Sequence, residues 1–227
     1  MYWDSTYILV IIGAVLCLLA QSGVTTTYAR YSRVQSRNHM TGAQAAQRIL
    51  QANGIYDVRI EHVSGNLTDH YDPKNRVLRL SDSVYGSTSV AAIGVAAHEC
   101  GHALQHHRGY LPLQFRTMLY PVANIGSQLC WPLILAGIMF SYTFVEIGIF
   151  MFCAVVLFQI VTLPVEFNAS SRALRILGDS GMLYEDEVKS TRKVLRAAAL
   201  TYVASVASAV LQLLRLLLLF GNRRDND

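Results

Sequence analysis

Four apolar stretches, each long enough to cross a lipid bilayer, constrain this 227-residue chain more than any other feature. A spanning helix needs about 20 predominantly apolar residues, and its backbone polar groups must be paired inside the helix. The stretches are 6–28, 118–140, 142–165 and 197–220. Only 15% of the residues are charged, against about 25% in soluble domains. The sequence therefore predicts a mainly α membrane protein with about four transmembrane helices.

The placement of basic residues predicts how these helices are oriented. Lys and Arg are enriched in cytoplasmic loops. No basic residue precedes the first stretch, whereas Arg30, Arg33 and Arg37 follow it directly. The turn between the second and third stretches has no basic residue, and the segment after the third is rich in them. We expect a multi-pass protein of the cell membrane, with an external N-terminus and both large loops in the cytosol.

Two stretches need further comment. The first has no small-residue cleavage pattern after its apolar run, so we expect a retained anchor rather than a removed signal peptide. After the fourth stretch, Arg223 and Arg224 would lie outside, against the charge rule, while Arg215 is close enough to the end to reach the interface. A partly interfacial or re-entrant path for 197–220 therefore stays open.

These expectations divide the chain into five segments. They are an N-terminal anchor at 1–28, a cytosolic region at 29–117, a transmembrane hairpin at 118–165, a cytosolic helical segment at 166–196, and a fourth apolar helix with a polar tail at 197–227. We expect the cytosolic regions to face the same side of the membrane.

The cytosolic region 29–117 is predicted to be a small α+β unit. Thr41 begins a capping box and opens a short helix that ends near Asn53. Alternating and β-branched residues predict strands at 58–63 and 76–80, separated by a polar stretch with turn residues. A long helix follows over 89–107, for which Ser87 or Thr88 is the predicted N-cap.

The long helix contains the pattern HExxH, in the sequence AHECGHA. Residues four apart lie on one face of a helix, so His98 and His102 can each give a nitrogen to one zinc ion at about 2.0–2.1 Å. Glu99 is rotated by about 100° from His98, and its carboxylate can act as general base on a zinc-activated water. Cys100 points away from the ligand face and is expected to pack in the core. Two histidines and a carboxylate also suit Fe(II), but this motif favours zinc.

A catalytic zinc needs a third protein ligand and keeps its fourth position open. His106 continues the helical face of the motif. However, the longer pattern HExxHxxGxxH requires Gly and His where this chain has Gln105 and Arg108. One straight helix also rarely gives three ligands to a tetrahedral ion, so we look for the third ligand elsewhere.

Glu166 is the expected third ligand. It follows the third apolar stretch, and two crossings return the chain to the membrane face of His102. An ionisable group at the end of a span is a functional candidate. Glu146 follows an odd number of crossings and is expected on the far side, and the acidic run 185–187 is expected on a solvated helix face. The sequence thus predicts one zinc per chain on His98, His102 and Glu166.

The segments AAHECGHALQ and PVEFNASSRAL, together with the earlier stretches LTDHYDP and RVLRLS, resemble the YugP-type family of neutral zinc metallopeptidases of bacterial membranes. The resemblance covers essentially the whole chain. A more distant similarity is to the HtpX and prenyl-protein (CAAX) protease class. It implies a gluzincin-like, cytosol-facing site in a zincin-like region. The return motif of that class, E-x-x-A-D, matches Glu166 and Ala169, but this chain has Ser170 in place of the Asp that supports a zinc histidine.

Three further residues are candidates for stabilising the oxyanion of a tetrahedral intermediate: His70, Tyr71 and Arg172. For His70, an ordinary loop histidine is the alternative. We also expect the strand at 76–80 to be able to pair with an extended peptide at a sheet edge.

These features predict a membrane zinc metalloendopeptidase that acts on membrane or membrane-proximal polypeptides. Its partners are then a polypeptide substrate and the lipid bilayer, and no basic block of the nucleic-acid-binding type is present. Two alternatives stay open. A structural zinc would be closed by a fourth protein ligand such as His70 or His106. An adaptor would hold less than about one zinc per chain. The sequence does not give the oligomeric state.

Overall fold

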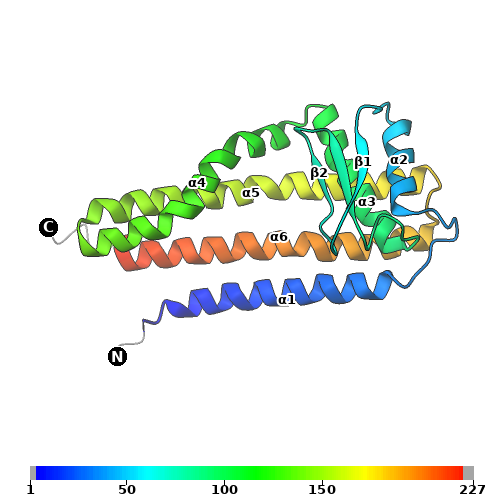
Figure 1. Cartoon of the computed structure of the whole chain (residues 1–227). Coiled ribbons are helices and arrows are strands. Elements are labelled where there is room, and N and C mark those ends of the chain that lie inside the picture. Colours follow the sequence, from blue (N-terminus) through cyan, green and yellow to red (C-terminus); the bar gives the residue numbers. More distant parts are fainter. Residues whose placement is uncertain (1–3, 222–227) are drawn as a thin grey trace. The chain divides into compact units, whose positions relative to one another are not determined.

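The computed structural model describes residues 4–221 and is mainly helical, with one small sheet (Figure 1). Arg223 and Arg224, which bear on the orientation of the fourth apolar stretch, lie outside the described residues. The contacts divide the chain into two compact units. One, the apolar unit, comprises Met1–Gln21, Gln114–Pro164 and Leu200–Asp227. The other, the sheet unit, comprises Ser22–Leu113 and Val165–Ala199.

Within residues 4–221, four helices are long and apolar enough to cross a membrane, as the sequence predicts. They are α1 (Tyr7–Tyr31), α4 (Leu111–Met139), α5 (Tyr142–Asp179) and α6 (Glu185–Phe220). Only 6% to 28% of their most apolar windows is buried inside the protein. Large apolar side chains such as Leu18 therefore stay exposed, which is expected for a surface that faces lipid rather than water.

Two of these helices continue well past the predicted ends of the apolar stretches. α5 runs on from Val165 to Asp179 without a break, and α6 begins at Glu185 rather than near Ala197. Three acidic residues occupy the first turn of α6, where carboxylates interact favourably with the helix dipole. The cytosolic segment predicted at 166–196 is thus built from the ends of two long helices.

Arg215 is the charged residue of the fourth apolar stretch, and the apolar unit provides it with partners. Its guanidinium lies 3.5 Å from Asp4 Oδ2 and 4.2 Å from the centre of the Tyr7 ring. Ionisable groups in membrane helices are commonly paired in this way, because an isolated charge in hydrocarbon is costly. The pair joins the beginning of α1 to the last part of α6.

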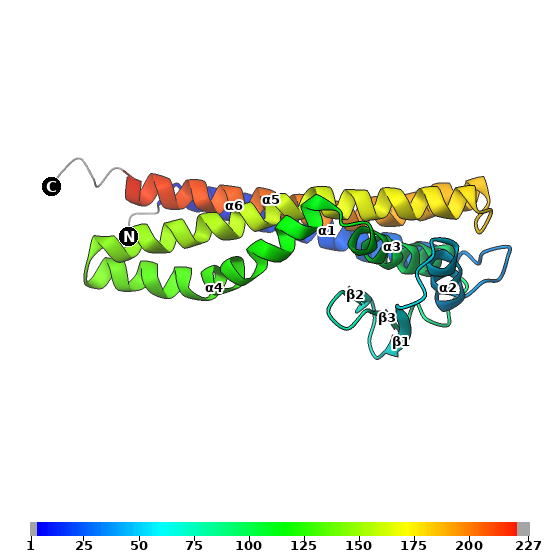
Figure 2. The same ribbon diagram turned by 90° about the horizontal axis from the view of Figure 1, so that it is seen from above.

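The sheet unit contains α2 (Gly42–Ala52), α3 (Val90–His107) and strands β1 (Arg59–Val63), β2 (His70–Asp72) and β3 (Val77–Ser81). Thr41 caps α2 with the predicted capping box. The strand order is β1-β3-β2, with β1 parallel and β2 antiparallel to β3. Figure 2 shows the three strands together on one side of α3.

Three local predictions are corrected by the sheet unit. Ser89, not Ser87 or Thr88, is the N-cap of α3, since its side chain accepts a hydrogen bond from the Ala92 amide. The stretch predicted to be only a polar loop contains β2. The strand predicted at 76–80 is central in the sheet, so both of its edges are already paired and it cannot add a peptide. The edge strand next to α3 is β2.

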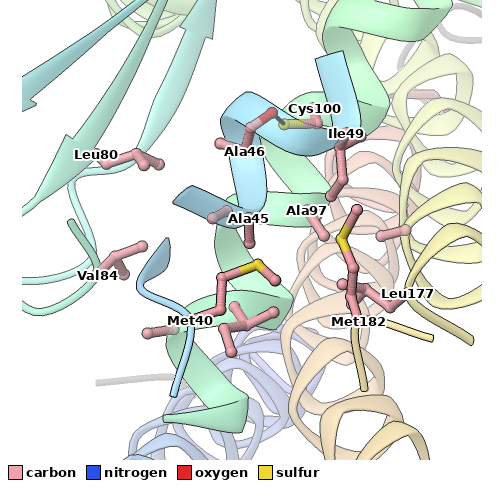
Figure 3. Close-up of a cluster of buried hydrophobic side chains, with 14 of the residues drawn as sticks. Met40, Ala45, Ala46, Ile49, Leu80, Val84, Ala97, Cys100, Leu177 and Met182 are labelled. Atoms are coloured by element: carbon pink, nitrogen blue, oxygen red, sulfur yellow. Dashed lines mark hydrogen bonds between the residues drawn. The ribbon is translucent and has the colours of Figure 1, made fainter. Parts of the chain in front are cut away.

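The core of the sheet unit is built on α3 (Figure 3). Ala97 and Cys100 on α3 are buried with Ile49 of α2, Leu80 of β3 and Leu177 of α5. The Cys100 thiol donates to the Ala46 carbonyl at 3.7 Å, and burial raises its pKa. The prediction that Cys100 packs in the core is therefore confirmed. One face of α3 is fixed by this core, and the histidines of the motif lie outside it.

Candidate metal centre

Helix α3 presents His98 and His102 one turn apart. Their ring centroids lie 4.8 Å from each other with the ring planes 86° apart. Both side chains are mostly buried, with 15% and 13% of their surface exposed. The rigid core contacts of α3 hold its backbone, and this arrangement leaves the imidazole nitrogens to point towards a common region.

Glu166 of α5 completes the group. Its Oε2 lies 3.2 Å from His98 Nε2 and 3.5 Å from His102 Nε2, and its side chain is buried. Two donors that each lie about 2.0–2.1 Å from a tetrahedral ion are about 3.3–3.4 Å apart. The three donor atoms all lie within 4.8 Å of one another. The spacing and the chemistry of the donors therefore fit a zinc ion, and this cluster can hold a metal.

The Nδ1 atom of each histidine has an oxygen partner. Ser170 Oγ lies 3.0 Å from His98 Nδ1, and Gln105 Oε1 lies 3.0 Å from His102 Nδ1. Histidines that bind metals usually hydrogen-bond through the nitrogen that is not coordinated. Both Nε2 atoms are thus the ones directed towards Glu166.

Gly101 allows α3 to approach α5 closely enough for this geometry. A Cβ atom at position 101 would lie 2.7 Å from the Ala169 carbonyl oxygen and 3.0 Å from the Ala169 Cα. Both atoms belong to the α5 backbone, which cannot move aside as the end of a side chain can. The glycine therefore sets the distance between the helix that carries the two histidines and the helix that carries Glu166.

Gly101→Ala is expected to lower the thermal midpoint of the protein by about 5 °C and to weaken zinc binding. Overpacking costs about 1–3 kcal/mol, and 1 kcal/mol corresponds to roughly 2–4 °C for a chain of this size. Gly178→Ala on α5 is the matched control, because its Cβ would meet only Val188 Cγ2 at 3.9 Å. Thermal unfolding of both variants, with and without zinc, checks this. Equal midpoints would contradict the packing argument.

Glu99 lies next to the metal cluster and is nearly buried, with 9% of its surface exposed. Burial raises the pKa of its carboxyl group, although the neighbouring His102 and His98 oppose the shift. Its Oε2 accepts a hydrogen bond from the backbone amide of Tyr71 at 3.0 Å. Strand β2 therefore holds one oxygen of the carboxylate, Oε2, in place.

Asp69 fixes the start of β2 in this position. Its carboxylate accepts hydrogen bonds from the Ser81 amide at 2.7 Å and from the Ser81 hydroxyl at 2.9 Å. Burial raises the pKa of Asp69, and the two Ser81 bonds act in the opposite direction. The residue thus ties the loop before β2 to the end of β3.

The other candidate residues lie around the cluster rather than in it. The Tyr71 hydroxyl lies 2.9 Å from His106 Nδ1, so these two side chains connect β2 to the end of α3. His70 is exposed and hydrogen-bonds the Thr68 carbonyl through Nδ1 at 2.8 Å. Arg172 donates from Nε to Asn168 Oδ1 at 2.7 Å. In the described part of the chain, neither His70 nor His106 belongs to the group of metal-binding side chains.

The acidic residues that the sequence analysis compared with Glu166 as a third metal ligand lie elsewhere in the structure. Glu185 pairs with Lys189 at 2.6 Å, and Asp186 pairs with Arg37 at 2.6 Å. Glu187 accepts from the backbone amides of Arg37 and Tyr184, both at 2.8 Å. These three residues therefore stabilise the beginning of α6. Glu146 belongs to the apolar unit and is not part of the cluster found among residues 4–221.

Comparison with known proteins agrees with this geometry. The family model described as "Putative neutral zinc metallopeptidase" matches residues 6–221. The chain belongs to this family. The resemblance to YugP-type zinc metallopeptidases is thereby confirmed. No solved structure matches the chain.

A relative of this zinc metallopeptidase family is the Bacillus subtilis (strain 168) protein named "Putative membrane protease YugP". The two are 47% identical over 213 residues, which is 93% of this chain and 95% of the relative. The family description agrees with the metal cluster on α3 and α5, and the name of the relative agrees with the four apolar helices.

Proposed function

We propose that this protein is a membrane-embedded zinc endopeptidase whose zinc is held by His98, His102 and Glu166. The observation that carries the proposal is the meeting of these donors from α3 and α5 beside the buried Glu99. Membership of a zinc metallopeptidase family supports it independently. The region formed by α3, the sheet and the end of α5 then acts as the zincin-like catalytic region.

Zinc at this position would supply Lewis-acid chemistry, polarising a peptide carbonyl and lowering the pKa of water towards about 7. Glu99 acts as the general base: Oε1 takes a proton from the attacking water and returns it to the leaving amine. The Tyr71 amide holds the carboxylate in place through Oε2.

The substrate is proposed to be an extended segment of a membrane or membrane-proximal polypeptide. β2 is an edge strand of the sheet, and it contacts α3 through the bond from Tyr71 to Glu99. A segment lying along β2 would therefore pass beside the general base, and edge strands commonly bind extended peptides. His70, Tyr71 and Arg172 remain the proposed candidates for stabilising the oxyanion.

The site is proposed to face the cytosol of a cell whose cytoplasmic membrane holds the four helices. Arg30 at the end of α1 and the basic residues of 166–196 support this orientation, since both belong to the sheet unit. Lys and Arg favour the cytoplasmic side of membranes. The carboxylate of Glu166, after the apolar part of α5, would then be close to the interface.

A structural zinc is less well supported than a catalytic one. Structural zinc sites are usually closed by four protein ligands. In the portion that the structure describes, the cluster comprises three side chains. His70 and His106, the two histidines considered as a fourth ligand, are not among these three side chains.

The purified full-length protein is expected to contain about one zinc per chain and to lose most of its peptidase activity on chelation. Activity on a casein-type substrate should return when zinc is added back, because the ligands lie on helices held by the core. Elemental analysis and the cleavage assay measure the two quantities together. His102→Ala is expected to lose both the bound zinc and the peptidase activity. Cleavage that persists in zinc-free protein would contradict the proposal.

A further inference from the structure

The side chain of Gln105 is fully buried on α3, one turn beyond His102. A buried amide is costly unless its donors and acceptor are hydrogen-bonded. Both the oxygen and the nitrogen of the Gln105 amide are hydrogen-bonded. Its Oε1 lies 3.0 Å from His102 Nδ1, and its Nε2 donates to the Val165 carbonyl at 2.8 Å and to Asn168 Oδ1 at 3.1 Å.

The orientation of this amide is fixed by its partners. The Val165 carbonyl can only accept, so the group facing it must be the amide nitrogen. Asn168 Oδ1 is identified as an oxygen because Arg172 Nε donates to it at 2.7 Å. The Gln105 oxygen therefore has to face His102. Since an amide oxygen only accepts, His102 Nδ1 must carry a proton, and in the neutral ring the lone pair is then on Nε2, towards Glu166.

His98 has a different kind of partner. The Ser170 hydroxyl lies 3.0 Å from His98 Nδ1, and a hydroxyl can rotate to act as either donor or acceptor. It therefore does not by itself select one tautomer of the ring. Of the two histidines, only His102 has its protonation pattern fixed by the geometry of its neighbour.

Gln105 also connects the two helices that carry the metal ligands. Val165 directly precedes Glu166, and Asn168 lies half a turn beyond it on α5. One amide group thus bonds to a ligand side chain on α3 and to the backbone beside a ligand on α5. A shift of either helix would stretch one of these bonds, so the amide couples the position of His102 to that of Glu166.

We propose that Gln105 is a positioning residue of the metal site. It holds His102 as the Nδ1–H tautomer, with Nε2 directed to the metal, and it ties the motif helix to the turn that carries Glu166. The inference rests on the proposed function, because it requires that the cluster binds zinc.

Two substitutions test separately the hydrogen-bond acceptor that Gln105 offers to His102 and the hydrogen bonds that Gln105 donates to α5. Gln105→Met keeps the length of the side chain but removes the oxygen, and we expect it to weaken zinc binding by about 10–100-fold. Gln105→Glu keeps an acceptor for His102 and loses both donors to α5. It should retain zinc affinity to within about threefold, since carboxylates commonly support zinc histidines. Both variants lose the bonds to Val165 and Asn168, so both should lower the thermal midpoint of the metal-free protein.

Zinc affinity is measured on the full-length protein in detergent, by competition with a chromophoric chelator. Gln51→Met, the same change at an exposed position of α2, is the control and should bind zinc like the wild type. Unchanged affinity in Gln105→Met overturns the inference. An equal loss of zinc affinity in Gln105→Met and Gln105→Glu also overturns it, because the acceptor facing His102 would then make no difference to zinc binding.

The same measurements separate this inference from the proposed function. If His102→Ala abolishes zinc binding while Gln105→Met does not, the metal site stands and only the role of Gln105 is wrong. If the wild type holds no zinc, or if His102→Ala binds it as well as the wild type, both proposals are overturned. Zinc affinity that is lowered in Gln105→Met and retained in Gln105→Glu supports the positioning role.

Discussion

Glu99→Gln is expected to lower peptidase activity by about 10²–10⁴-fold while the protein keeps about one zinc per chain. Glutamine has the same shape, and its amide oxygen can still accept the hydrogen bond from the Tyr71 amide that Glu99 accepts now. It cannot take up a proton near neutral pH, so the general base is lost. The three metal donors are unchanged. Single-turnover cleavage and elemental analysis on the same sample measure both quantities.

Glu185→Gln is the matched control for this variant. Glu185 is exposed at the beginning of α6 and pairs with Lys189, and surface pairs of this kind contribute little to stability. Its activity should stay within about twofold of the wild type. Full activity in Glu99→Gln would show that Glu99 is not the base. Loss of zinc from Glu99→Gln would show instead that the residue supports the metal site.

Features that depend on neighbouring residues in the chain could be predicted from the sequence. Thr41 and Gln44 form a capping box because they are three residues apart at a helix start, and the structure contains both of its bonds. His98 and His102 share a face of α3 because the helical repeat places them there. The four apolar helices likewise follow from length and composition.

Strand β2 could not be predicted in this way. Its three residues, His70 to Asp72, are polar or aromatic and show no apolar alternation. The strand exists because β3 pairs with it and because Asp69 bonds to Ser81 across the sheet. The central position of β3 could not be predicted for the same reason, since the order of strands in a sheet depends on contacts between distant segments.

The role of Gln105 illustrates the same limit at the metal centre. In the sequence, Gln105 appears only as a departure from a longer histidine motif. Its partners Val165 and Asn168 are 60 and 63 positions away along the chain. A glutamine inside an apolar helical pattern was a usable signal, because a buried amide must find partners. The sequence could not show which partners these are.

The case of Glu166 is different, because a long-range relation was predicted from topology. Two membrane crossings separate it from His102, so the chain has to return to the same face. Counting membrane crossings predicts on which face of the membrane Glu166 lies, but it does not predict which of its atoms approaches the histidines. The structure brings Glu166 Oε2 to within 3.5 Å of both imidazole Nε2 atoms, and this closeness makes Glu166 testable as a ligand.

Glu166→Ala is expected to weaken zinc binding by more than about 100-fold and to remove measurable peptidase activity. Loss of a hydrogen-bonding partner of a ligand alone costs about 10–100-fold in metal affinity, and this change removes a donor outright. Two imidazoles remain, and they cannot fix a tetrahedral ion with one open position. Glu166→Gln keeps one neutral oxygen donor and should give an intermediate affinity. Chelator competition on the purified protein measures all three.

Glu146→Ala provides the control, since it removes a glutamate from the same helix, α5, in the part assigned to the apolar unit. Its zinc affinity should match that of the wild type. Size-exclusion profiles and helical circular dichroism must agree among the variants, so that a lost site is not confused with lost folding. If Glu166→Ala binds zinc as tightly as Glu146→Ala, the third ligand is another group. The closeness of Glu166 to the two histidines would then be an ion pair between α3 and α5, and the zinc would need a donor from outside the cluster.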